Sequence, residues 1–301
     1  MSERFLQMKS NTLQIGSFTF HWGSRTYVMG IMNVTPDSFS GDGMLANGQV
    51  LDLAVEQARA FLANGADILD VGGESTRPGS APVNAEEEMQ RVLPVIDVLR
   101  RSFPDALISV DTYKASVAEE ALRMGANIIN DVWGFRADPE LAKVAAKYKT
   151  PVILMHNRSN PASVEVRERL GGTYLGAEYQ NLLDDVKQEL LASVEIALKA
   201  GVEERQIMLD PGIGFGKTRE HNLELINRLG EIRSLEYPIL LGTSRKSFIG
   251  FTLDLPPQDR VEGTAATVAV GITRGADIIR VHDVKEMARV AKMTDAIVRT
   301  Q

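Results

Sequence analysis

The segment Leu209 to Lys217, with the sequence LDPGIGFGK, combines an acid, three glycines and a lysine. The apolar run at 207–209 predicts a buried strand that delivers Asp210 at its end. The three glycines then let the backbone approach a ligand closely. Two interpretations stay open for this segment alone: a binding loop, or a glycine-rich turn into a helix that Asp210 caps.

Acids and amides follow other short apolar runs in the same way. Asp111 and Asp131 come directly after the runs at 107–110 and 127–130, and Asn130 is the last residue of the second run. Together with Asp210 they suit a planar heterocycle with several ring N–H and amino donors. The alternative is that Asp111 and Asp131 cap the helices after their strands. The sequence leaves Asp70 and Glu74 open between a structural and a catalytic role.

Basic residues follow the remaining runs. Alternation along the run at 278–281 places Arg280 and His282 on one side of a strand. With Asn33, at the end of the first run, they are predicted to bind a polyphosphate. Arg245 and Lys246, after the run at 239–241, are expected to neutralise Asp210, to hold an anionic substrate, or both.

Three further observations concern single residues or residue types. Arg77 lies among small and turn-forming residues, where its planar guanidinium suits a phosphate or carboxylate. Met155 is predicted to line the floor under an aromatic ring, and His156 is interpreted as a wall residue. The histidines do not have the spacing of a zinc site.

These residues must be positioned by elements that repeat along the chain. Buried strands are predicted at 28–32, 68–71, 107–110, 127–130, 152–155, 207–209, 239–241 and 278–281. Amphipathic stretches such as 50–64 and 86–101 separate them, and Gly65, Gly125 and Gly275 are predicted to end helices. The alternation indicates an α/β fold, a TIM (β/α)8 barrel, with functional side chains at the strand C-termini. A doubly wound sheet is the alternative, but no G-x-G-x-x-G follows the first strand.

Residues 1–301 are expected to form one domain, in which residues 1–26 are an N-terminal β-hairpin with its turn at 22–24. The 33 basic and 40 acidic residues give a net charge of −7, which argues against a nucleic-acid or anionic-membrane surface. The absence of cysteine excludes disulfides and thiolate chemistry. No apolar run reaches the roughly 18 residues of a membrane span. A cytoplasmic location is expected.

The motifs together are similar to those of the dihydropteroate synthases, in the pterin-binding barrel superfamily. The matching segments lie at 29–40, 72–79, 111–114, 129–131, 210–217, 244–247 and 280–283, in family order. One departure is Ser40-Gly41-Asp42-Gly43, where the family usually has Ser-Asp-Gly-Gly, so any contact of Asp42 is in doubt. The resemblance implies condensation of 6-hydroxymethyl-7,8-dihydropterin diphosphate with p-aminobenzoate, giving 7,8-dihydropteroate and pyrophosphate in folate biosynthesis.

The resemblance also implies roles for single residues. The pterin would be held by Asp111, Asn130, Asp210 and Lys246, in a pocket lined by Met155, Phe215 and Gly242. Asn33 would hold Mg²⁺ bound to the diphosphate, whose oxygens Arg280 and His282 would contact. The p-aminobenzoate site would include Thr76, Arg77, Pro78 and Ser247. Asp210, Lys246, Arg280 and His282 are the expected catalytic residues.

The chemistry of these residues fits an ionising displacement in which the diphosphate leaves a cationic pterin methylene. The resemblance also implies a homodimer through barrel helices and membership of a family that is a sulfonamide target. A corrinoid-dependent methyltransferase that uses a methyl-folate is the nearest rival, and a catalytically silent pterin-binding protein is another. Neither rival needs the phosphate pair Arg280 and His282.

Overall fold

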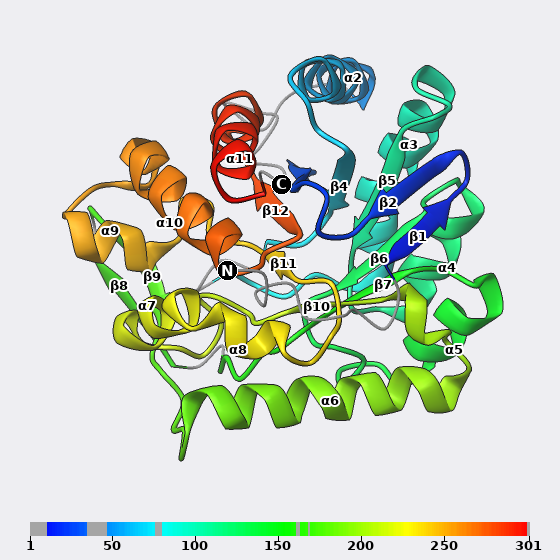
Figure 1. Ribbon diagram of the computed structural model, residues 1–301. Helices are drawn as coiled ribbons and strands as arrows, with labels where there is room; N and C mark the ends of the chain where they lie inside the picture. Colours follow the sequence, from blue (N-terminus) through cyan, green and yellow to red (C-terminus); the bar gives the residue numbers. More distant parts are fainter. Residues whose placement is uncertain (1–10, 35–46, 76–79, 161–162, 168, 300–301) are drawn as a thin grey trace.

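A computed structural model describes residues 11–34, 47–75, 80–160, 163–167 and 169–299 of the chain. Eight parallel strands form its centre (Figure 1). They are β3 (Tyr27–Asn33), β4 (Ile68–Gly72), β5 (Leu107–Asp111), β6 (Ile128–Asp131), β7 (Val152–Met155), β10 (Ile207–Asp210), β11 (Leu240–Leu241) and β12 (Ile278–Val281). Neighbours follow the order β10-β7-β6-β5-β4-β3-β12-β11, and a parallel bridge between Leu209 and Ile239 joins the two ends. The predicted TIM barrel is confirmed, with every predicted strand in place.

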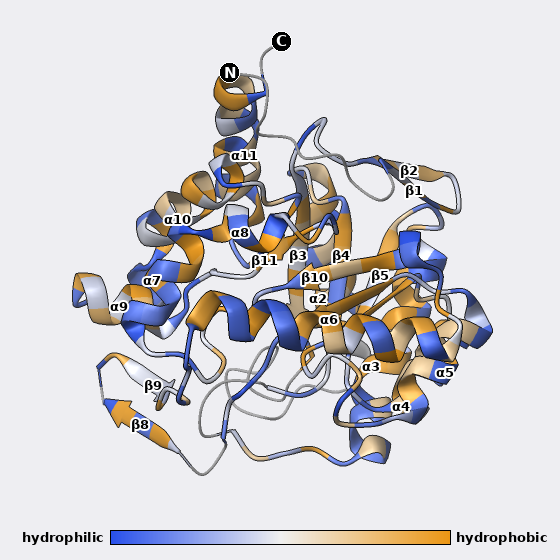
Figure 2. Ribbon diagram, turned by 60° about the horizontal axis from the view of Figure 1, so that its bottom comes forward, coloured by the Kyte–Doolittle hydropathy of each residue, from blue (hydrophilic) through white to orange (hydrophobic). Residues whose placement is uncertain are grey.

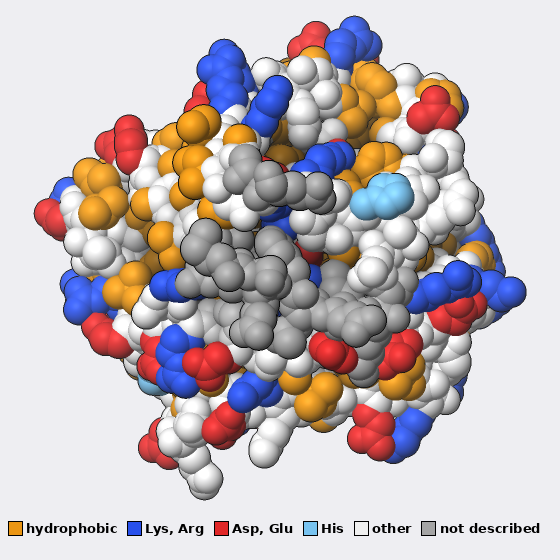
Figure 3. All heavy atoms as spheres, viewed as in Figure 1, with side chains coloured by type: hydrophobic (Ala, Val, Ile, Leu, Met, Phe, Trp, Pro, Cys, Tyr) orange, Lys and Arg blue, Asp and Glu red, His pale blue; other side chains and the backbone are white. Residues whose placement is uncertain are grey.

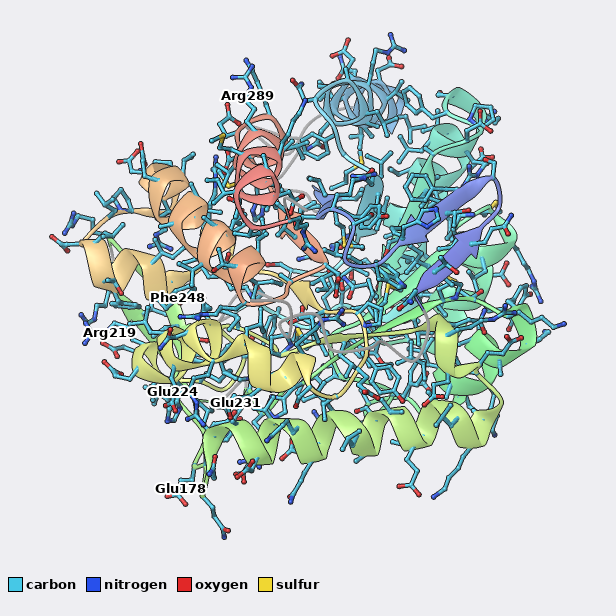
Figure 4. The ribbon with its side chains drawn as sticks, viewed as in Figure 1. Glu178, Arg219, Glu224, Glu231, Phe248 and Arg289 are labelled. Carbon is cyan, nitrogen blue, oxygen red and sulfur yellow. The ribbon has the colours of Figure 1, made fainter. Side chains whose placement is uncertain are left out.

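Helices surround the strands, as the amphipathic stretches predict. They are α2 (Asn47–Ala63), α3 (Ala85–Ser102), α4 (Ala115–Arg123), α5 (Glu140–Tyr148), α6 (Leu182–Ala200), α7 (Arg219–Asn227), α8 (Leu229–Arg233), α9 (Ser247–Leu253), α10 (Val261–Thr273) and α11 (Val284–Val298). Arg219 on α7 and Arg289 on α11 lie on the outer surface of this ring (Figure 4). Among the described residues, no helix is both long and apolar enough to span a bilayer.

Glycine ends three of the helices at the predicted places. Gly65, Gly125 and Gly275 have φ of 98°, 108° and 103°, the left-handed conformation that glycine adopts without steric cost. In each case the next residue donates its N–H to a carbonyl of the last helical turn, as Ala126 does to Ala121 at 2.9 Å. The chain therefore turns sharply from each helix into the following strand.

The inner face of the barrel has an apolar layer at the N-terminal ends of the strands, which we call the floor. Its residues are Met29, Ile68, Leu107, Ile128, Ile153, Met208, Leu240 and Ile278, all buried. The hairpin of β1 (Thr12–Ile15) and β2 (Phe18–His21) packs against this floor with Leu13, Ile15, Phe20 and Trp22. The Phe20 ring stacks on Trp22 and meets Tyr27 edge-on, with centroids 4.8 and 4.7 Å away. The hairpin thus closes one end of the barrel.

The hairpin is present, but its predicted turn at 22–24 is wrong. Leu13 pairs with Phe20 and Ile15 with Phe18, so the turn consists of Gly16 and Ser17. Gly16 has φ of 58°, as a two-residue hairpin turn requires. The segment from Trp22 to Ser24 instead connects the hairpin to β3.

A second hairpin was not predicted. It consists of β8 (Val164–Arg167) and β9 (Gly171–Tyr174), in the connection between β7 and α6. The two hairpins lie at opposite ends of the barrel (Figure 2). Val166 in β8 is 70% exposed, so this strand has no continuous apolar run that could reveal it. The sequence also predicts a long polar loop at 33–43, most of which falls on 35–46, outside the described residues.

Candidate active site

Polar side chains from several strands meet at the C-terminal end of the barrel, which we call the mouth. Arg280 on β12 donates from Nε to Asp70 Oδ2 at 2.6 Å and from Nη2 to Asp111 Oδ2 at 2.5 Å. Asn130 on β6 donates from Nδ2 to the same Asp70 oxygen at 3.2 Å. These residues occupy inward positions one pleat repeat or more above the floor, because alternate residues of a strand face the same side. The structure therefore brings Asp111, Asn130 and Arg280 together, as predicted.

Asp210 adjoins this group from β10. A Cβ atom placed on Gly242 would lie 3.9 Å from Asp210 Oδ2 and 4.0 Å from the Arg280 Cβ, so the three residues are neighbours. Asp210 Oδ1 accepts from the backbone N–H of Gly212 at 2.7 Å. Burial raises the pKa of Asp210, and the positive charge of Lys246 opposes that rise. Asp210 is thus a buried acid with a nearby cation.

Lys246 lies across the same region from the loop after β11. Burial lowers its pKa to about 8, against the opposite effect of Asp210. Its Nζ is 4.4 Å from the centroid of the Phe215 ring and donates to the Ile213 carbonyl. The ring of Tyr174 in β9 stacks with the Phe215 ring, with centroids 6.3 Å apart. Lys246 and Phe215, both predicted for the pterin pocket, are therefore in contact.

The glycines after Asp210 all have left-handed backbone. Gly212, Gly214 and Gly216 have φ of 71°, 85° and 65°. A Cβ on Gly212 would lie 1.8 Å from the His156 carbonyl oxygen, which no side chain could tolerate. The alternative in which Asp210 caps the next helix is wrong, because Thr218 accepts from the His221 N–H and caps α7. The segment is a loop packed against the end of β7.

Lys217 holds this loop from behind, a role that the sequence did not reveal. It is 1% exposed, and its Nζ donates to the carbonyls of Gly212 and Phe215 at 2.9 and 3.1 Å. Nζ also lies 2.9 Å from Nδ1 of His156. A lysine that follows a glycine-rich segment gives the same sequence pattern whether it is buried or exposed. The sequence alone therefore could not predict the buried role of Lys217.

His156 is buried between two charges, as a wall residue. Burial lowers its pKa to about 4, and the charge of Lys217 lowers it further. Its Nε2 lies 3.2 Å from Glu189 Oε2, and the pKa of Glu189 falls to about 2 chiefly because of this contact. His156 is therefore neutral and accepts from Lys217 through Nδ1, with the tautomer assigned from these partners.

His282 is oriented by the loop after β11. The backbone N–H of His282 donates to Ser244 Oγ at 3.1 Å, and this hydroxyl lies 3.0 Å from His282 Nδ1. With the ring proton on Nε2, Nδ1 accepts from the Ser244 hydroxyl, and this tautomer leaves Nε2–H as a donor. Arg245 forms two hydrogen bonds to Asp283, at 2.9 and 2.5 Å. Of the two adjacent cations, only Lys246 lies beside Asp210.

Asp111, at the end of β5, and Asp131, at the end of β6, are the two acids that the sequence left between binding and capping, and they behave differently. Asp131 accepts from the N–H groups of Trp133 and Phe135 at 2.8 and 2.5 Å, so it fixes a turn. Burial raises its pKa to about 6. Asp111 does not cap α4, whose first N–H donates to Asp138 instead. Burial, against the effect of Arg280, raises the pKa of Asp111 to about 7.

Other predicted residues lie around this centre. Met155 is buried beside Asp210 in the register of β7 and β10, and Ser247 is the first residue of α9. Glu74 accepts from Lys114 at 2.5 Å, which favours its structural role. Thr76, Arg77, Pro78 and Asp42 lie outside the described residues, so their roles stay predictions.

Asn33 is half-buried at the end of β3, and its amide has no hydrogen-bond partner among the described residues. An amide oxygen is a hard ligand that suits Mg²⁺, which characteristically binds one or two protein oxygens together with substrate phosphates. The described part of the chain has no group of three or more His, Cys, Asp or Glu residues that could hold a metal. The described residues therefore fit a magnesium ion carried by a diphosphate.

Comparison with known proteins identifies the family. The "pterin binding enzyme" family matches residues 29–282. A dihydropteroate synthase of Clostridium beijerinckii is 53% identical over 288 residues, which cover 95% of this chain and 100% of that protein. The chain belongs to the dihydropteroate synthases. It is accordingly a transferase of folate synthesis.

Solved dihydropteroate synthases have the same fold. The enzyme of Yersinia pestis, determined as a complex with a sulfonamide drug, is 40% identical with a TM-score of 0.85 and covers 96% of this chain and 100% of its own. The enzyme of Xanthomonas albilineans with 4-aminobenzoic acid is 35% identical with a TM-score of 0.86, covering 97% of this chain and 100% of its own. Both cover the whole barrel described above.

Proposed function

We propose that this dihydropteroate synthase joins 6-hydroxymethyl-7,8-dihydropterin diphosphate to p-aminobenzoate by a dissociative displacement assisted by Mg²⁺. The observation that carries the proposal is the group of Arg280, Asp111 and Asn130 at the mouth, with Asp210 and Lys246 beside it. Oxygen atoms that can accept from the donors of a pterin ring thus lie beside positively charged groups that can bind a leaving diphosphate. The relative solved with 4-aminobenzoic acid supports the second substrate.

At the pterin end, Asp111, Asn130 and Asp210 supply acceptor oxygens for the ring and amino N–H groups. Phe215, Met155 and the bare face of Gly242 give the flat ring apolar contacts. Lys246, with a pKa of about 8, supplies the neighbouring donor. Asp210 also stabilises positive charge that develops on the pterin methylene, because a buried carboxylate acts through a low local dielectric.

At the diphosphate end, the Arg280 guanidinium and the Nε2–H of His282 donate to phosphate oxygens. Asn33 would hold a Mg²⁺ ion that comes with the diphosphate. This ion would neutralise charge on the leaving group. The amine of p-aminobenzoate is nucleophilic when neutral, so its attack needs no strong general base. Ser247 and the residues at 76–78 are proposed to hold its carboxylate.

The test is pyrophosphate release from the pterin diphosphate, with and without p-aminobenzoate. We expect release with the amine, together with an equal amount of dihydropteroate. Lys246→Met should reduce kcat/KM about 100-fold or more, on the scale of a lost electrostatic contact to the transition state. Arg245→Met is the matched control, because this adjacent cation pairs with Asp283 and should retain activity within about threefold. Normal turnover by Lys246→Met would contradict the assignment of the pterin site.

The same assay separates the rival functions. A corrinoid-dependent methyltransferase would transfer a methyl group from a methyl-folate and release no pyrophosphate. A silent pterin-binding protein would bind the pterin and release nothing. The family assignment favours the synthase over both, as do the N–H donors of Arg280 and His282, which suit a diphosphate.

We also propose that the chain forms a homodimer through its barrel helices. Val270 on α10 and Met293 and Ile297 on α11 are 41%, 63% and 64% exposed. Hydrophobic side chains gather over these two helices in the space-filling view (Figure 3). A contiguous exposed apolar patch is typical of an interaction surface. Sedimentation should give a dimer for the native chain and a monomer for Met293→Lys/Ile297→Lys, and a native monomer would contradict the proposal.

A further inference from the structure

Asp70 on β4 lies below the residues that face a ligand. Its side chain is fully buried, whereas those of Arg280 and Asp111 are 20% and 10% exposed. A group with no exposure at the mouth does not reach a ligand there. Its effect on the reaction must therefore be transmitted through the side chains that it contacts.

One oxygen of Asp70 makes both of these contacts. Oδ2 accepts from Nε of Arg280 at 2.6 Å and from Nδ2 of Asn130 at 3.2 Å. Arg280 is assigned to the diphosphate end of the substrate and Asn130 to the pterin end. A single buried oxygen thus connects the two ends of the proposed site.

The contact with Asn130 also fixes which way its amide faces. Because the NH₂ group donates to Asp70, the carbonyl oxygen is on the opposite side of the amide. That orientation presents an acceptor, the type of group that a pterin ring with N–H and amino donors needs. Rotation of the amide by 180° would present donors to donors and would leave the Asp70 contact unmade.

Asp111 holds the same guanidinium from a different position. It lies at the end of β5 and donates nothing itself, accepting from Nη2 of Arg280. A pterin that donates to Asp111 shares this carboxylate with the Arg280 guanidinium, so the contact between Asp111 and Arg280 is open to change on binding. The contact of Asp70 with Nε is out of reach of the ligand and persists.

We propose that Asp70 is a positioning residue that fixes the Arg280 guanidinium and the Asn130 amide while Asp111 changes partner between the free and the bound site. This inference rests on the proposed function for the identity of the ligand. Oδ1 of Asp70 has no hydrogen-bond partner among the described residues, so the side chain makes its hydrogen bonds within that part of the chain to these two residues. Asp70 is therefore dedicated to the site and not to supporting a turn.

The test replaces Asp70 by asparagine, which keeps the shape and removes the charge. Two affinities are measured by calorimetry: pyrophosphate with Mg²⁺, and 6-hydroxymethylpterin, which lacks the diphosphate. We expect Asp70→Asn to weaken both about tenfold or more, on the scale of a buried charged hydrogen bond. Ser109→Ala is the matched control, because Ser109 is a buried polar neighbour of Asp70 in the strand register. It should leave both affinities within about twofold of the native values.

Double-mutant cycles distinguish positioning from general damage. In an Arg280→Met background, Asp70→Asn should no longer weaken pyrophosphate binding, while its effect on the pterin remains. In an Asn130→Ala background the pattern should reverse. Full additivity in both backgrounds would overturn the proposal, because a merely structural loss would reduce both affinities whatever residue stands at 280 or 130.

A measurement on the native protein covers the case in which Asp70→Asn does not fold. The Nε–H of Arg280, observed by NMR with labelled arginine, should exchange slowly with solvent in the free protein and stay protected when 6-hydroxymethylpterin is added. Rapid exchange in the free protein, or loss of protection with the pterin, would overturn the proposal. If the native protein released no pyrophosphate, the proposed function would fail, and the protection of Nε–H would still decide the role of Asp70.

Discussion

The two ends of the barrel differ although the same strands form both. On β5, Leu107 faces the floor and Asp111 faces the mouth, and on β12 Ile278 and Arg280 are related in the same way. The floor residues pack on the aromatic side chains of the hairpin, whereas the mouth residues form buried ion pairs. Residues two or four positions apart in a strand face the same side of the sheet. Those at one end of the barrel therefore contribute to stability and those at the other end to chemistry.

The pKa shifts express the same difference in energetic terms. Burial raises the pKa of Asp210 and lowers that of Lys246, so each charged form is disfavoured by its surroundings. Such a site is held in place by the rest of the fold, which is the usual relation between a functional site and its scaffold. Substitutions at the two ends should therefore have opposite consequences.

The largest effect on stability is expected where the N-terminal hairpin packs on the floor. Phe20→Ala removes a fully buried ring that contacts Trp22 and Tyr27, and should lower the free energy of unfolding by about 3–5 kcal/mol. Denaturant unfolding measures this loss. The KM of the folded fraction for the pterin substrate should stay unchanged, and a raised KM would show that the two ends are not separate.

The mouth should give the reverse result. Asp210→Asn keeps an oxygen for the Gly212 N–H but removes the charge, so kcat should fall about 100- to 1,000-fold. The relief of burying the carboxylate and the loss of its attraction to Lys246 oppose each other, so the melting temperature should change little. Steady-state kinetics and thermal unfolding on the same preparation test both statements, and a large fall in melting temperature would contradict the comparison.

The pH dependence of kcat/KM for the pterin substrate gives a further test of the charged residues at the mouth. Binding needs Asp111 ionised and Lys246 protonated, with pKa values of about 7 and 8, so the profile should be highest between these values. Below pH 7 the value should fall about tenfold per pH unit. Asp111→Asn should be less active and should lack this acid limb, whereas an unchanged limb would exclude Asp111 as its source.

The same shift affects stability with a sign that can be worked out. The pKa of Asp111 is higher in the folded chain than its ordinary value of 3.8, so the folded state binds more protons between pH 4 and 7. The contribution of Asp111 to stability therefore falls as the pH rises through this range. Asp111→Asn should flatten that part of the stability profile.

The smallest effect is expected at the turn of the N-terminal hairpin. Gly16 has φ of 58° with open space around its α-carbon, so Gly16→Ala is strained only by its backbone. The expected loss is about 1–2 kcal/mol of unfolding free energy, without any change in activity. A loss near that of Phe20→Ala would mean that the turn also supports the floor.

The sequence was sufficient for the barrel because its strands are buried on both faces. Runs such as Ile278 to Val281 are apolar on the side that meets the helices, and turn residues mark their ends. The glycine ends of helices, such as Gly125, were equally readable because left-handed backbone selects this residue. The turn of the first hairpin was misplaced because both Gly16-Ser17 and Gly23-Ser24 carry the same signal.

The site was only partly readable. Asp111 and Asp131 both follow buried strands, and only the structure separates the one that pairs with Arg280 from the one that fixes a turn. Lys217 and Asp70 could not be assigned, because their roles depend on partners far away in the chain. Family resemblance supplied the substrate, which no charge or spacing in the chain specifies.

The hairpin that covers the floor also determines the end from which substrates enter and products leave. Since Phe20 and its neighbours pack against the apolar residues at the N-terminal ends of the strands, substrates are expected to enter from the mouth. The ligand that binds deepest in the barrel must bind first, and it dissociates after any ligand that is bound nearer the mouth. A site that opens at one end favours ordered substrate binding and product release over a random order. Steady-state kinetics would show this order.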